Sequence, residues 1–152
     1  MKKIENNFIA LLLGLLSLIM FMQVLFRYIL NNSLTWSEEL AKFIFIWITF
    51  LGAAICFRDR IHLKVDFLTN KLPVKYGILM EVLNTLLIII FSGIMLVVGT
   101  LWVINVSGTL SPAMGLPLNI VFYAAFPVSA VLTFLYGLAR LKKEIKEYKS
   151  KL

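Results

Sequence analysis

Four long apolar segments constrain this chain more than any other feature of its sequence. They cover residues 8–30, 36–57, 76–106 and 118–139. Each is at least as long as the roughly 20 residues that an α-helix needs to cross the hydrocarbon core of a membrane. Barrel strands would show short alternating segments, whereas these runs are continuously apolar. The segments therefore predict an all-α membrane protein whose four transmembrane helices form two helical hairpins.

The composition leaves no room for a soluble enzyme domain. Of the 152 residues, 61% are hydrophobic and 15% are charged, whereas soluble domains are about half apolar and about a quarter charged. The four spans and a basic tail over 140–152 account for the chain as a single domain. The one cysteine, Cys56, excludes a disulfide framework within the chain.

The positive charges are distributed unevenly over the connections. Of 15 Lys and Arg residues, 13 precede the first span, follow the last or lie between the second and third. Only Arg27 and Lys42 lie toward the other side. The positive-inside rule then places both termini, the 58–75 loop and the basic tail in the cytoplasm. Because orientation explains the net charge of +7, we expect no nucleic acid as a partner.

The spans contain few residues that could take part in catalysis, ion coupling or metal binding. No acidic residue lies in the middle of a span, and the nearest, Glu81, lies near the start of the third, where it complements the helix dipole. One histidine and one cysteine cannot form a conventional metal site, and no catalytic arrangement or phosphate loop is present. We therefore expect no enzyme activity, no cofactor and no self-sufficient ion pump. These features favour a structural or partner-binding membrane subunit.

The connection between the first two spans carries the most informative charges. Thr35 and Glu38 have the spacing of a capping box, so we expect the second helix to begin at Thr35 with Glu38 and Glu39 in its first turn. We favour a pairing of Arg27 with Glu38 or Glu39 across the hairpin. The alternative is that Arg27 reaches the lipid headgroups while the acids are solvated. The same charges could instead face a partner protein.

Aromatic and small residues predict further contacts. Trp36 is expected to anchor the second helix at the membrane interface, and the deeper Trp47 to pack against another helix or protein. On the fourth span, small residues recur every four positions: Ala125, Ser129, Thr133 and Gly137. Such a stripe lets another helix approach closely, either within the chain or from a second subunit. Pro127 removes a helix hydrogen bond and predicts a kink.

Several short fragments occur in a fixed order within the four-span frame. They are Arg27-Tyr28, Trp36-Ser37-Glu38-Glu39-Leu40, Phe45-Ile46-Trp47, Phe50-Leu51-Gly52-Ala53-Ala54, His62 with Val65-Asp66, residues 111–117 and residues 123–128. In this order the chain resembles the small membrane subunit of tripartite ATP-independent periplasmic (TRAP) transporters, the DctQ-type family. The resemblance covers nearly the whole chain.

This resemblance implies a sodium-coupled importer of organic acids in a bacterial inner membrane. A large multi-spanning permease subunit would carry the substrate and sodium, and a periplasmic solute-binding protein would deliver the substrate. The small subunit would scaffold the permease and help dock the binding protein. The acid stays open between C4-dicarboxylates, sialic acids, keto acids and other sugar acids.

In that frame, the outer loops 31–37 and 107–119 are candidate docking surfaces. The residues singled out in the second loop are Ser111, Pro112, Met114 and Pro117. A rigid turn between two spans is the equal alternative for this loop. His62 and Asp66 lie on the cytoplasmic side and are interpreted as structural, and residues 63–72 form either a short interfacial helix or a plain loop.

Two other functions compete with this interpretation. One is an autonomous four-helix transporter of the multidrug type, which needs an essential acid in a span and for which Glu81 is the candidate. The other is a generic membrane assembly or anchoring protein. Such a protein would also lack catalytic and ion-coupling residues, but it would have no role in the uptake of organic acids.

Overall fold

The computed structural model describes residues 2–32, 34–59 and 74–150. Over these residues the chain forms α1 (Lys2–Tyr28), α2 (Thr35–Arg58), α4 (Val74–Asn105), the π-helix η1 (Asn119–Tyr123) and α5 (Ala125–Ser150). Four helical stretches are long and apolar enough to cross a membrane, which confirms the predicted all-α fold with four candidate spans. His62, Asp66 and the stretch 63–72 lie outside the described residues.

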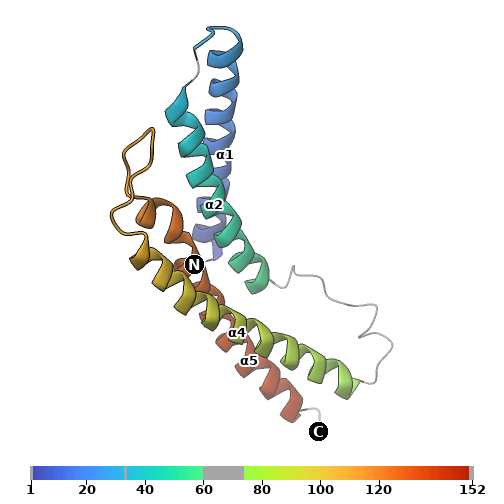
Figure 1. Cartoon of the computed structure of the whole chain (residues 1–152). Helices are drawn as coiled ribbons and strands as arrows, with labels where there is room; N and C mark the ends of the chain where they lie inside the picture. The colour runs from blue at the N-terminus through green and yellow to red at the C-terminus, as the bar shows by residue number, and fades with distance from the viewer. Residues whose placement is uncertain (1, 33, 60–73, 151–152) are drawn as a thin grey trace.

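The helices are arranged as two hairpins that meet along one contact. α1 packs against α2, α4 packs against α5, and α2 joins the hairpins by packing against α5. In the described residues no Cα atom of α1 lies within 8 Å of a Cα atom of α4 or α5, so the order of the helix axes in space is α1, α2, α5, α4. Figure 1 shows the two hairpins diverging away from the crossing of α2 and α5. The chain is therefore an open layer of helices with α1 and α4 at its two edges.

Glycines allow the close approach of α4 and α5. A Cβ atom at Gly99 of α4 would lie 3.3 Å from side-chain atoms of Phe126 and Pro127 on α5. A Cβ atom at Gly137 of α5 would lie 2.6 Å from the Cγ1 atom of Ile89 on α4. Small residues let helices pack tightly in a membrane, where no hydrophobic force drives them together. The two glycines thus mark two points of close approach along one antiparallel interface.

The start of α2 is confirmed at Thr35, but the predicted capping box is wrong. The residue at the cap position is Leu34, and its side chain makes no capping hydrogen bond. Because Thr35 already belongs to the helix, its hydroxyl is one residue too late to cap it. The Ser37 hydroxyl instead donates to the Leu34 carbonyl over 2.7 Å, and Glu38 accepts a hydrogen bond from α1.

The fourth span begins with an irregular helical segment before Pro127. The chain runs through η1 and Ala124, whose backbone keeps right-handed helical angles (φ −64°, ψ −20°), and then forms α5. Pro127 lies in the first turn of α5, where a backbone N–H has no acceptor within the helix and its loss costs little. The π-helical part of the span thus lies directly before the first turn of α5 that contains the proline. α5 also continues through most of the predicted basic tail, to Ser150.

Candidate functional site

The connection between α4 and η1 is a compact loop. Leu110 and Pro117 form an antiparallel bridge, and the Ser111 N–H donates to the Leu116 carbonyl over 2.8 Å. Gly108 and Gly115 take φ angles of +92° and +64°, a region that glycine enters without strain. Paired backbone groups and two tight turns therefore give the loop a defined shape.

Glu39 fastens this loop to the first turns of α2. Its Oε1 atom accepts the Ala113 N–H over 2.9 Å, and its Oε2 atom accepts the Met114 N–H over 3.0 Å. Two hydrogen bonds to one ionised carboxylate are stronger than bonds between neutral groups. Figure 1 shows the loop extending along the upper part of α2, toward the end where α1 and α2 are connected. Glu39 thereby brings together the two loops singled out in the sequence.

The four docking candidates of this loop differ in exposure. Ser111 is buried, Met114 and Pro117 are half-buried, and Pro112 is exposed. Leu110, which sequence reasoning missed, is 59% exposed. The accessible tip of the loop is uncharged, so it offers backbone groups and small apolar surfaces to a partner.

Arg27 is exposed at the end of α1. Among the described residues its guanidinium forms no ion pair with Glu38 or Glu39, and these acids have other partners. Glu38 accepts a hydrogen bond from Gln23 Nε2 over 3.0 Å, while Glu39 holds the loop. Trp36 is 45% exposed at the same end of the hairpin.

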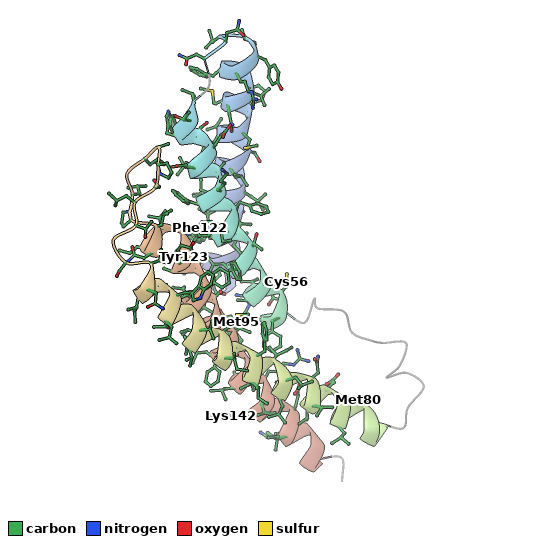
Figure 2. The ribbon with its side chains drawn as sticks, in the orientation of Figure 1. Cys56, Met80, Met95, Phe122, Tyr123 and Lys142 are labelled. Atoms are coloured by element: carbon green, nitrogen blue, oxygen red, sulfur yellow. The ribbon has the colours of Figure 1, made fainter. Side chains whose placement is uncertain are left out.

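The π-helix η1 is held in place by aromatic residues. The Trp47 indole N–H donates to the Val121 carbonyl over 2.7 Å, so Trp47 packs against another helical segment as predicted. The ring of Phe122 lies edge-on to Phe43 of α2, with centroids 6.3 Å apart, and Tyr123 meets Trp102 of α4 at 5.8 Å. Figure 2 shows Phe122 and Tyr123 where η1 lies beside α2. η1 thus links both hairpins directly beneath the loop.

The small-residue stripe of α5 lies largely inside the chain. Ala125, Ser129 and Gly137 are buried and Thr133 is half-buried. Ser129 and Thr133 line a cavity of about 340 Å³ between α2, α4 and α5, and Met95 of α4, labelled in Figure 2, lines it from the opposite side. Both hydroxyls donate to carbonyls of their own helix over 2.9 Å. This central cavity is lined mainly by apolar side chains and a few hydroxyls, and none of its lining side chains is charged.

A second polar cluster lies at the opposite end of the helices. The Arg58 side chain is 8% exposed and forms ion pairs with Glu5 of α1 and with Asp59. It also donates to Asn6 over 3.0 Å, and its Cζ atom lies 5.9 Å from the centroid of the Tyr136 ring on α5. Arg58 therefore ties the start of α1 and the end of α2 to α5.

The described residues contain no group of three His, Cys, Asp or Glu side chains that could hold a metal ion. Five of their acids have hydrogen-bond or ion-pair partners: Glu5, Glu38, Glu39, Asp59 and Glu144. A model of the family described as "Tripartite ATP-independent periplasmic transporters, DctQ component" matches residues 16–147. The chain belongs to the DctQ family.

Several curated relatives of this DctQ-family chain are named as transporter components. It is 30% identical over 117 residues to a TRAP transporter small permease protein of Haemophilus influenzae, covering 75% of this chain and 71% of the relative. It is 31% identical over 97 residues to a C4-dicarboxylate TRAP transporter small permease protein of Vibrio cholerae, covering 64% of this chain and 41% of the relative. A sialic acid TRAP transporter permease of H. influenzae is 42% identical over 57 residues, which are 38% of this chain and 9% of that permease. The DctQ-family chain is thus a non-enzymatic transport protein of the membrane.

Sequence reasoning missed two contacts that define this DctQ-family fold. Glu39 binds backbone N–H groups, which every residue except proline has, so no side-chain pattern marks its partners. Arg58 is one of the basic residues whose distribution predicts the orientation of the chain in the membrane. This explanation of its charge gives no reason to expect that its side chain is buried. Its position directly before Asp59 is the one local signal of an ion pair.

Proposed function

We propose that this chain is the small, non-catalytic membrane subunit of a sodium-coupled TRAP importer for organic acids in a bacterial inner membrane. It scaffolds a large permease subunit and helps to dock a periplasmic solute-binding protein. Both termini lie in the cytoplasm, and the Glu39-bound loop lies on the periplasmic side. Family membership and the distribution of basic residues support this assignment.

The main observation that supports the proposal is the arrangement of the helices in an open layer. Among the described residues only α2 packs closely along α1, and the hydrophobic windows of α1 and α4 are 0% and 11% buried within the chain. A carrier working alone must enclose a polar path for its substrate, whereas the central cavity is apolar and uncharged. The path must then be supplied by a partner, for which these helices provide an apolar scaffold.

Co-purification tests the scaffolding role. The tagged chain is co-expressed with the large permease encoded beside it and extracted in a mild detergent. We expect a stable complex, and we expect deletion of the chain to abolish uptake of the labelled acid that the operon's binding protein binds. Relatives named for C4-dicarboxylate and sialic acid transport make these the first acids to try. Failure of the two subunits to co-purify, with uptake unchanged in the deletion strain, would contradict the proposal.

The docking role predicts a specific effect of Glu39→Gln. The amide loses the negative charge that accepts two loop N–H groups, and bonds to charged groups contribute about 1.5–3 kcal/mol each. We expect hydrogen exchange at Ala113 and Met114 to rise and uptake at limiting binding protein to fall about tenfold, the factor that about 1.4 kcal/mol produces.

Glu81→Gln is the matched control, because it makes the same chemical change on α4. We expect it to leave uptake unchanged, and this result would also count against an autonomous transporter that depends on Glu81. The docking role of the loop would be wrong if Glu39→Gln accelerated exchange but uptake at limiting binding protein stayed at the wild-type rate.

A further inference from the structure

A groove between α1 and α2 changes from apolar to polar along its length. It has a volume of about 310 Å³, and its lining includes Leu16, Met20 and Phe45 as well as Gln23, Glu38 and Lys42. Leu16 precedes Gln23 on α1 by seven residues, which corresponds to about 10 Å along the axis of a helix. The polar part of the groove therefore lies near the connected ends of α1 and α2, and the apolar part extends toward the middle of the membrane.

Gln23 leaves one hydrogen-bond acceptor unused in this groove. Its side chain is buried, at 9% exposure, and its Nε2 atom donates to Glu38 Oε1 over 3.0 Å. A carboxylate only accepts, so this bond fixes the orientation of the amide. The opposite atom, Gln23 Oε1, has no hydrogen-bond partner. Buried acceptors are rarely left unpaired, and this one lies beside a carboxylate, so the site calls for a donor that carries positive charge.

The groove also presents a cation. Lys42 lies one helical turn after Glu38 and is exposed, and among the described residues it forms no ion pair within 4 Å. Arg27, four residues after Gln23 on α1, is exposed as well. The polar part of the groove therefore presents both hydrogen-bond acceptors and positive charges. A zwitterion, which carries one positive and one negative group, complements this arrangement.

We propose that this groove binds one phospholipid with a primary ammonium headgroup, of the phosphatidylethanolamine class. The ammonium donates to Gln23 Oε1 and to Glu38, and the phosphate lies near Lys42. One acyl chain covers Met20 and Phe45, which are 47% and 61% exposed in the chain. A lysine or arginine from a partner helix would satisfy Gln23 but would leave Lys42 facing a second cation. The zwitterion satisfies both, so the observations favour the lipid.

Native mass spectrometry of the full-length chain tests this site. Lipid-depleted protein in mild detergent is titrated with phosphatidylethanolamine, phosphatidylcholine or phosphatidylglycerol of identical acyl chains. Phosphatidylcholine keeps both charges but has no N–H donors, and phosphatidylglycerol keeps the phosphate without the ammonium. We expect the ethanolamine lipid to bind at least tenfold more tightly than the other two. Equal binding of all three lipids by the wild-type chain would overturn the proposal.

Two variants separate the two halves of the headgroup. Gln23→Met keeps the length and burial of the side chain but removes the acceptor, and we expect it to reduce the preference for phosphatidylethanolamine to less than twofold. Lys42→Met should weaken all three phospholipids alike, because each carries a phosphate. Asn84→Leu, which removes an exposed amide from α4, is the control and should retain the full preference. A Gln23→Met chain that keeps the wild-type preference would contradict the assignment.

Photo-crosslinking in membranes distinguishes the lipid from a protein partner. A photoreactive amino acid replaces Met20 in the chain co-expressed with the large permease. We expect the crosslinked product to gain the mass of one phospholipid. A product that contains the permease instead would show that the groove is a protein interface and would overturn the proposal, while leaving the scaffolding role intact.

Discussion

Replacing Arg58 by methionine is expected to destabilise the whole chain. The guanidinium is 8% exposed and pairs with Glu5 and Asp59, whose side chains are 22% and 21% exposed. Removing one partner of a buried pair costs about 3–5 kcal/mol, and the partial exposure of both acids lowers the expected loss to about 2 kcal/mol. Thermal unfolding of the purified chain in detergent should show a Tm lower by about 4–8 °C.

Lys142→Met provides the control for this substitution. Lys142 is an exposed basic residue on α5, so its replacement removes one positive charge from the same end of the molecule without removing a buried contact. We expect an unchanged Tm. Both variants keep at least 12 of the 13 basic residues on that side, so neither should invert the chain in the membrane. Equal Tm values for the two variants would contradict the structural role of Arg58.

The sequence predicts the helices and their pairing into hairpins well, because long apolar runs leave the helix as the only spanning structure that satisfies the backbone. It does not predict the open order α1, α2, α5, α4. The span 79–105 has a mean hydropathy of 2.7, and its packed face is marked only by small residues at seven-residue spacing, Thr85, Ser92 and Gly99, which are buried. Contacts then depend on local shape, as at Gly99 and Gly137, which a hydropathy pattern does not record.

The candidate site is likewise only partly predictable from the sequence. Glu38 and Glu39 stand out in the sequence because two acids begin an otherwise apolar helix, and both belong to polar contacts. Their partners could not be predicted. The bond from Gln23 to Glu38 depends on the register of the α1–α2 hairpin, and the bonds to Glu39 depend on the fold of a loop more than 70 residues away. Pro127 marks an irregular region correctly, but the irregularity is the π-helix η1, which precedes the first turn of α5 where the proline lies.

Gly137→Leu is expected to have the largest effect on the α4–α5 hairpin. The Cβ atom alone would lie 2.6 Å from Ile89 Cγ1, and the β-branched side chain of Ile89 has few rotamers with which to move away. The helices must separate, which costs about 1–3 kcal/mol for ordinary overpacking and more for a side chain of this size. We expect little monodisperse protein on size-exclusion chromatography and a marked loss of the permease complex.

A double-mutant cycle with Gly137→Ala keeps this prediction measurable if the leucine variant does not fold. Ile89→Ala removes the Cγ1 atom that the new methyl group meets, so the Tm loss caused by Gly137→Ala should be at most half as large in the Ile89→Ala background as in the wild-type chain. Gly93→Ala is the matched control, because a Cβ atom there meets nothing within 4 Å and alanine raises helix propensity by about 1 kcal/mol. If Gly137→Ala were as stable as Gly93→Ala, the close contact of α4 and α5 at Ile89 would not contribute to the stability of the hairpin.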